Sequence, residues 1–226
     1  MEEQEEKKLE VIPEDKKINK LGRILREIAE WILCFVIAYI LYLTLNYFIG
    51  TISGVKQVSM KNTAVEGDRL IIQRPTIFKH ELKHGDIITF EAPNAESSVS
   101  DESDDNIANY VDYEGFNQFL YKFVGIGQMS YIKRVIGLPG DHIVISDTGD
   151  VYRNDEKLEE PYLKDGTTSK NGKYTDLVVP EGTVFAMGDN RLESSDCRVF
   201  GCIPISRVNG YVIARVWPFN KIGKLQ

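Results

Sequence analysis

Two residues far apart in the chain, Ser59 and Lys133, are of types that can carry out acyl transfer together. Lys133 lies in YIKRVIGLPGD, residues 131–141, an apolar run interrupted by two cations. Side chains alternate across a strand, so Lys133 shares one face with Tyr131 and Val135. An edge strand whose cations reach water is one explanation of this pattern. The other is a lysine that apolar neighbours keep uncharged, so that it acts as a base.

A serine hydroxyl is a poor nucleophile until a base removes its proton, and histidine is the usual base. His80, His84 and His142 stand at turns, and no motif joins any of them to a serine, so the pattern does not indicate a Ser-His-Asp triad. A lysine can replace histidine if its pKa falls from about 10.4 to about 7–8, which costs about 3–4 kcal/mol for the charged form. Burial among apolar groups can supply that shift, so Lys133 is the candidate base.

Two further stretches carry groups of the right type for such a site. Ser59 stands in QVSMKNTAVEGDRLII, residues 57–72, shortly before a Gly-Asp turn. Residues 187–201, MGDNRLESSDCRVFG, lead from a Gly-Asp-Asn turn into a dense set of Ser, Asp and Arg. We hypothesise that these stretches and the Lys133 strand meet in the folded protein.

An apolar segment precedes the candidate nucleophile. Residues 31–50 contain no charged side chain, and about 20 helical residues span a bilayer core of about 30 Å. Apolar residues at helical spacing extend the pattern back, which predicts a juxtamembrane and transmembrane helix over residues 21–50. A buried core helix is disfavoured because little else in the chain is apolar enough to surround it. A cleaved secretory signal is disfavoured by the length of the segment and by its lack of a small-x-small end.

The flanking charges predict the orientation of this helix. The basic residues of the N-terminal flank are Lys16, Lys17, Lys20, Arg23 and Arg26. Only Lys56 and Lys61 follow closely on the other side. By the positive-inside rule, residues 1–20 form a cytoplasmic tail and the chain after about residue 50 is outside.

The candidate nucleophile is tethered to the bilayer. Ten residues separate Ile49 from Ser59. At about 3.5 Å for each extended residue, Ser59 lies within about 35 Å of the membrane exit. We therefore expect the lipid bilayer as a partner and a substrate whose cleavage site follows its own membrane-inserted segment.

The chain after the apolar segment is predicted to be β-rich. Short alternating or apolar runs are separated by turn residues. The runs are RLIIQR, DIITFEA, YIKRVIGL, HIVIS, DLVVP, TVFAMG and GYVIARVW. We expect an antiparallel sheet or partly open barrel over residues 51–226, with a smaller β cap at about 141–180. Residues 93–115 form an acidic insertion, and the aromatic residues at 116–123 either pack on the sheet or touch lipid.

Composition narrows the classes of partner. The chain has 27 basic and 34 acidic residues and a net charge of -7, which disfavours nucleic acid. The cysteines and histidines are not spaced in pairs, so the sequence does not indicate a structural metal site or a redox motif. Cys34 lies in the apolar segment, while Cys197 and Cys202 either form a short-loop disulfide or remain free thiols.

The three stretches resemble the signature boxes of the type I signal peptidases, membrane-anchored Ser/Lys proteases that remove leader peptides from exported preproteins. The resemblance runs from the apolar segment to the C-terminus, and the single anchor is similar to that of the Gram-positive members. YIKRVIGLPGD together with MGDNRxxSxDxR makes it specific. It implies a monomer that acts on preprotein signal peptides without metal or cofactor, prefers small residues at the first and third positions before the cut, and binds substrate as an added strand.

The resemblance also implies roles for individual residues. Ser59 matches the nucleophile of the family and Lys133 its general base. Ser194 matches a hydroxyl that hydrogen-bonds the lysine and orients it. Met60 matches a residue beside the substrate pocket.

The loop at residues 187–201 carries the remaining correspondences. Asp196 and Arg198 match a structural ion pair that supports this loop, and Asp189, Asn190 and Arg191 shape the turn beneath it. Cys197 stands where serine is common in the family, which we interpret as a neutral exchange.

The chain also departs from the family. The family pattern continues Ser-Met-x-Pro-Thr-Leu, but Asn62 stands at the proline position. Asparagine tolerates turns but does not restrict φ as proline does, which predicts a less rigid loop. Some members place a second oxyanion donor, a serine, where this chain has Gln57. The Ser59 backbone N–H remains as one donor, and the Gln57 amide is a candidate for the other.

Two other functions remain open. A catalytically impaired relative could serve as a scaffold or dedicated processing factor for a surface structure. This alternative stays open because the SMKNTA loop departs from the family pattern. A cytosolic self-cleaving Ser/Lys repressor is disfavoured by the apolar segment and by the lack of a helix-turn-helix pattern.

Overall fold

The computed structural model describes most of the chain. The described residues are 14–48, 50–74, 81–94, 106–112, 114–115, 129–163, 166–170 and 172–225. Most of the predicted acidic insertion and the aromatic residues at 116–123 lie outside them. The chain divides into two units, Met1–Thr44 and Leu45–Gln226.

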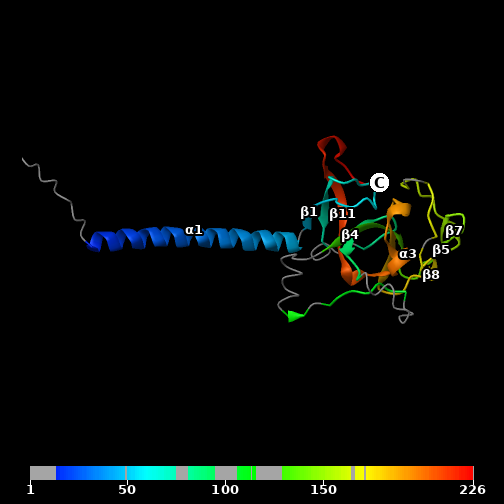
Figure 1. Ribbon diagram of the computed structural model, residues 1–226, viewed down its shortest axis with the longest axis horizontal. Helices are drawn as coiled ribbons and strands as arrows, with labels where there is room; N and C mark the ends of the chain where they lie inside the picture. Colours follow the sequence, from blue (N-terminus) through cyan, green and yellow to red (C-terminus); the bar gives the residue numbers. More distant parts are fainter. Residues whose placement is uncertain are drawn as a thin grey trace, which may run out of the picture. The chain divides into compact units, whose positions relative to one another are not determined.

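The described residues of the N-terminal unit belong to one long helix, α1, Glu14–Phe48, whose last residues lie in the second unit (Figure 1). Its span Gly22–Asn46 has a mean hydropathy of 2.1 and none of it is buried within the protein. The helix is therefore long and apolar enough to cross a membrane. It begins at Glu14, so it includes residues 14–20 of the segment that the sequence assigns to the tail; Glu14 and the three lysines there are good helix formers.

The second unit is built mainly from antiparallel strands in two sheets (Figure 1). The strands of the larger sheet are β1 Gly50–Gly54, β2 Arg69–Gln73, β3 Ile87–Glu91, β4 Ser130–Gly137, β9 Thr183–Met187, β10 Ile203–Pro204 and β11 Val208–Trp217. The strands of the smaller sheet are β5 His142–Ile145, β6 Val151–Arg153, β7 Glu156–Lys157 and β8 Asp176–Val178. The short helices are η3 Arg191–Glu193, α3 Cys197–Phe200, η4 Ile205–Arg207 and η5 Phe219–Lys221. The predicted mainly β class is confirmed, and the larger sheet is open rather than a closed barrel.

The strand that carries the candidate base lies inside the larger sheet. The strand order is β1-β2-β11-β3-β4-β9-β10, so β4 pairs with β3 and β9. Lys133 stands opposite Ile88 of β3, and Arg134 stands opposite Met187 of β9. Both cations are almost fully buried, with exposed fractions of 1% and 4%. The edge-strand explanation of this run is therefore wrong, because neighbouring strands cover both edges of β4.

The smaller sheet has the order β7-β6-β5-β8. The connection from β4 into β5 turns at Gly140, whose φ is 86°. The β6–β7 hairpin turns through Asn154 and Asp155, which both have positive φ as a tight two-residue hairpin requires. The turn at Gly140 thus lets the chain pass directly from β4 into the smaller sheet.

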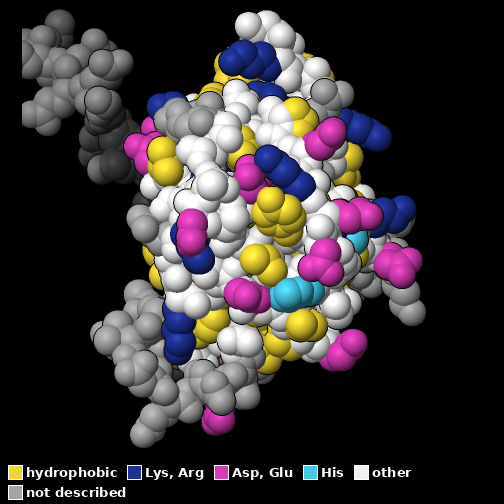
Figure 2. All heavy atoms as spheres, turned by 90° about the vertical axis from the view of Figure 1, so that its right-hand side faces the viewer, with side chains coloured by type: hydrophobic (Ala, Val, Ile, Leu, Met, Phe, Trp, Pro, Cys, Tyr) yellow, Lys and Arg dark blue, Asp and Glu magenta, His cyan; other side chains and the backbone are white. Residues whose placement is uncertain are grey.

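Two buried clusters form the core. The larger one packs residues of β4, β5 and β9 together with Cys197 and Cys202, which are buried free thiols. Burial raises the pKa of Cys202 to about 12 and that of Cys197 well above its usual value. The smaller cluster consists of Val55, Met60, Ala64, Leu70, Ile87 and Ile132. On the face drawn in Figure 2, acidic and basic side chains are interspersed around small apolar areas.

Candidate active site

The fold brings Ser59 and Lys133 into direct contact. Lys133 Nζ donates a hydrogen bond to Ser59 Oγ at 2.8 Å, across a sequence separation of 74 residues. Both side chains are buried, and Ser59 is 5% exposed. A hydroxyl and an amine at this distance can exchange a proton directly.

The surroundings of Lys133 favour the uncharged amine. Burial lowers the pKa of Lys133 to about 8, although Asp196 and Asp189 act against this shift. The ring of Tyr131, on the same face of β4, has its centroid 5.1 Å from Lys133 Nζ. Desolvation is therefore the main cause of the lowered pKa, and a substantial fraction of the lysine is neutral near pH 8.

Backbone hydrogen bonds hold the turn that contains Ser59. The N–H groups of Thr63 and Ala64 donate to the Met60 carbonyl at 3.0 and 2.7 Å. Asn190 donates its backbone N–H to the Ser59 carbonyl at 2.9 Å and its side-chain amide to the Val58 carbonyl at 3.1 Å. Asn190 thus joins the loop after β9 directly to the backbone of the candidate nucleophile.

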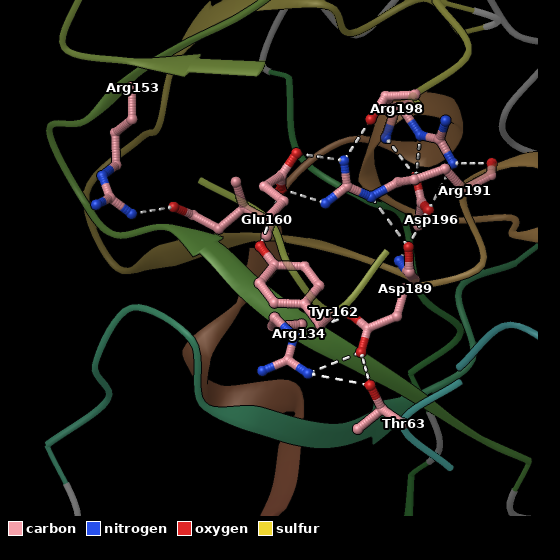
Figure 3. A network of polar contacts seen from close by, with 12 residues as sticks. Thr63, Arg134, Arg153, Glu160, Tyr162, Asp189, Arg191, Asp196 and Arg198 are labelled. Carbon is pink, nitrogen blue, oxygen red and sulfur yellow. Dashed lines mark hydrogen bonds and ion pairs between the residues drawn. The ribbon is translucent and has the colours of Figure 1, made fainter. Parts of the chain in front are cut away.

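A buried ion pair joins β4 to the same loop (Figure 3). Arg134 donates to both carboxylate oxygens of Asp189, at 2.9 and 2.7 Å. The Thr63 hydroxyl also donates to Asp189. Because Arg134 follows Lys133 and Thr63 lies close to Ser59, this cluster ties the candidate base and nucleophile segments together.

The predicted pair of Asp196 and Arg198 is also present and buried. Arg198 donates to the two Asp196 oxygens at 2.8 and 2.9 Å, and it also donates to the Arg191 carbonyl at 2.7 Å. Asp196 caps α3 and accepts the Gly188 N–H at 3.1 Å. The pair thus holds the loop that leads from Gly188 to α3.

Three residues that no sequence motif marks, Glu160, Tyr162 and Thr168, contact this loop and β4. Glu160 accepts two hydrogen bonds from Arg191, and Thr168 accepts another (Figure 3). Tyr162 donates its hydroxyl to Glu160 at 2.9 Å and places its ring against the Arg134 guanidinium, 4.0 Å from its centroid. No spacing in the sequence predicts these contacts; the only signal is that EEPYL falls within the stretch that resembles the family.

The remaining predicted residues surround the pair. The structure does not show the hydrogen bond that the resemblance implies between Ser194 and Lys133: Ser194 Oγ is buried and has no hydrogen-bond partner within the part of the chain that the structure describes. Gln57 lines the cavity beside Ser59. Met60 is fully buried in the smaller core cluster rather than in the cavity lining, but its neighbours Val55, Leu70 and Ile132 line the adjoining groove.

Two adjoining cavities open beside Ser59. One of about 300 Å³ is lined by Ser59, Lys133, Glu193 and Ser195 among others. The other, of about 460 Å³, lies over the face of the larger sheet formed by Leu70, Ile72, Thr89 and Ile132. Both are lined by Lys56, Gln57 and Tyr131, so an extended chain in the larger cavity would lead to Ser59.

Comparisons with known proteins show the family of this chain. A signal peptidase IB of Staphylococcus aureus (strain COL) is 30% identical over 212 residues, 87% of this chain and 93% of its own. A signal peptidase I of Bacillus licheniformis is 30% identical over 219 residues, 93% of this chain and 98% of its own. A crystal structure of a signal peptidase I from Enterococcus faecalis V583 covers 58% of this chain and 97% of its own, with 28% identity and a TM-score of 0.38. Residues 28–217 match the family described as signal peptidase, peptidase S26, and the chain therefore belongs to that family.

Proposed function

We propose that this chain is a type I signal peptidase that cleaves N-terminal signal peptides from exported preproteins with a Ser59/Lys133 dyad. The observation that carries this proposal is the 2.8 Å contact between Lys133 Nζ and Ser59 Oγ, together with the lowered pKa of Lys133. Membership of the signal peptidase family supports the substrate class.

The proposed reaction has two steps. Neutral Lys133 accepts the Ser59 proton while Ser59 Oγ attacks the scissile carbonyl. The tetrahedral intermediate collapses to an acyl-enzyme, and the leaving amine takes the proton from Lys133. Lys133 then removes a proton from the water that attacks the ester, and it returns this proton to Ser59 Oγ as the acid product leaves, which regenerates both Ser59 and the neutral lysine. No metal or cofactor takes part in these steps.

Neighbouring groups assist these steps. The Ser59 backbone N–H and the Gln57 amide donate to the developing oxyanion. The resemblance implies that Ser194 orients the lysine, and the buried Ser194 hydroxyl has no other hydrogen-bond partner among the described residues. The Asp196–Arg198 pair holds the loop that carries Ser194.

The substrate binds as an added strand in the groove that leads to Ser59. The apolar floor of the 460 Å³ cavity supports this proposal, since it can receive side chains that point down from an extended chain. Met60 packs beneath this floor. The resemblance implies small residues at the first and third positions before the cut.

The enzyme works at the outer surface of the membrane. Helix α1 is the single anchor, residues 1–20 are the cytoplasmic tail, and residues 51–226 form the outer peptidase domain with its β cap at about 141–180. The basic flank at residues 16–26 supports this orientation.

Preprotein cleavage by the full chain in detergent tests the function. Ser59→Ala and Lys133→Ala are expected to abolish cleavage. Ser206→Ala and Lys170→Ala, which change exposed residues of the same types, serve as matched controls with wild-type rates. A preprotein with isoleucine before the cut should remain intact. Near wild-type cleavage by either dyad variant would refute the proposed mechanism.

A further inference from the structure

The residue at the family's proline position has a backbone conformation that proline cannot adopt. Asn62 has a φ of 105°, whereas the proline ring restricts φ to about −65°. Few residues other than glycine occupy positive φ, and asparagine is one of the more tolerant. The turn that follows Ser59 in this chain therefore depends on a different constraint.

A side-chain hydrogen bond supplies that constraint. Asn62 Nδ2 donates to the Tyr162 carbonyl at 3.0 Å, across a separation of 100 residues. Tyr162 is itself held by the contact of its ring with Arg134 and by its bond to Glu160. The acceptor for Asn62 is thus fixed to the strand that carries Lys133.

We propose that Asn62 is a positioning residue, which ties the Ser59 turn to Tyr162 and so keeps Ser59 Oγ within reach of Lys133. This inference rests on the proposed function. The hydrogen bond takes the place of the proline ring. It restricts the backbone conformation of the turn through a tertiary contact, whereas proline restricts it through covalent geometry.

The tether acts on the exposed side of the turn. Thr63 is fixed on the buried side by its bond to Asp189, while the Asn62 side chain faces solvent. Without a partner, a non-glycine residue at positive φ relaxes toward ordinary backbone conformations. Such relaxation would shift the turn by a fraction of an ångström, and misplacement by about 1 Å lowers a rate by about 100-fold.

Three substitutions separate the effect of the Asn62 hydrogen bond from the effect of the positive φ. Asn62→Asp keeps the shape but cannot donate, and Asn62→Gly keeps positive φ but removes the tether. We expect both to lower kcat for preprotein cleavage by about tenfold with KM little changed, since less than 1 Å of misplacement is involved. Asn62→Pro removes both features and is expected to lose more activity; if it fails to fold, the first two variants still decide.

The rate–pH profile distinguishes positioning from general loosening. The burial of Lys133 on β4 does not involve Asn62, so the midpoint of the profile should stay where it is in the wild type. A loosened site would admit water to Lys133 and raise the midpoint. Asn154→Gly is the matched control, because Asn154 also has positive φ and donates to Asp141 at 2.8 Å, but in a hairpin of the smaller sheet. It should retain the wild-type kcat.

The outcomes distinguish this inference from the proposed function. Wild-type kcat in both Asn62→Asp and Asn62→Gly, with cleavage that Ser59→Ala abolishes, overturns the role of Asn62 alone. A rise of KM without a fall of kcat, or a raised midpoint, overturns it as well. If the wild-type protein itself does not cleave a preprotein, both the proposed function and the role of Asn62 are overturned.

Discussion

Arg134 and Asp189 form a buried ion pair with two hydrogen bonds, in which the Asp189 side chain is fully covered and the Arg134 side chain is 5% exposed. Arg134 and Lys133 are neighbours on β4 and point to opposite faces of the sheet. One cation is therefore fully compensated by a carboxylate, while the other contacts a neutral hydroxyl and has a lowered pKa. The sheet separates a structural cation from the candidate base.

Removing one partner of the Arg134–Asp189 pair should destabilise the protein strongly. Arg134→Met leaves Asp189 as a buried charge, for which a loss of about 3–5 kcal/mol is expected. The double variant Arg134→Met/Asp189→Leu should recover much of that loss, measured as Tm. Lys170→Met, which breaks an exposed pair with Asp147, is the control and should leave Tm unchanged. Equal Tm values for Arg134→Met and wild type would contradict the structural role.

Cleavage should depend on pH through Lys133. The pKa of this lysine is lowered to about 8 by burial, and only the neutral amine can act as base. We expect kcat/KM to rise tenfold for each pH unit below about 8 and to level off above it. Initial rates on a preprotein between pH 6 and 10 measure this. A flat profile over that range would argue against a lysine base.

Burial of Lys133 should also reduce stability at neutral pH. Its pKa is about 10.5 in the unfolded chain and about 8 in the folded one, so the unfolded chain binds more protons between these values. Stability therefore rises with pH from about 8 to 10.5, and below pH 8 the buried lysine costs about 3 kcal/mol.

The substitution Lys133→Met removes this cost while it keeps the volume. Its Tm should exceed that of the wild type at pH 7, and the difference should shrink as the pH approaches 10.5. Thermal unfolding in detergent at pH 7, 9 and 10.5 tests this. A difference that does not change with pH would mean that packing, not protonation, causes it.

Gly188 allows the two halves of the site to approach each other. A Cβ at this position would lie 2.5 Å from the Ser59 carbonyl oxygen and would also overlap Ser194 Oγ. Gly188→Ala should therefore displace the nucleophile turn and lower kcat by about 100-fold. Gly22→Ala, where an added Cβ meets open space, is the control. Wild-type cleavage by Gly188→Ala would show that the turn can move without cost.

Local patterns account for most of the secondary structure. All seven predicted runs form strands, because alternation and turn residues act over a few positions. The strand β1, GTISG, was not predicted, since it has little apolar character of its own. It forms through pairing with β2, in which Ile52 stands opposite Ile71.

The sequence by itself predicted the long apolar helix and the β-rich class and marked Ser59 and Lys133 as candidates, because composition, periodicity and residue type are properties of short segments. Only the tertiary structure decided that Lys133 is on an internal strand, that Asn62 bonds Tyr162, and that Glu160 bonds Arg191. Each of these depends on two segments meeting after the chain has folded, and hydrogen bonds between distant polar residues leave no periodic trace in the sequence.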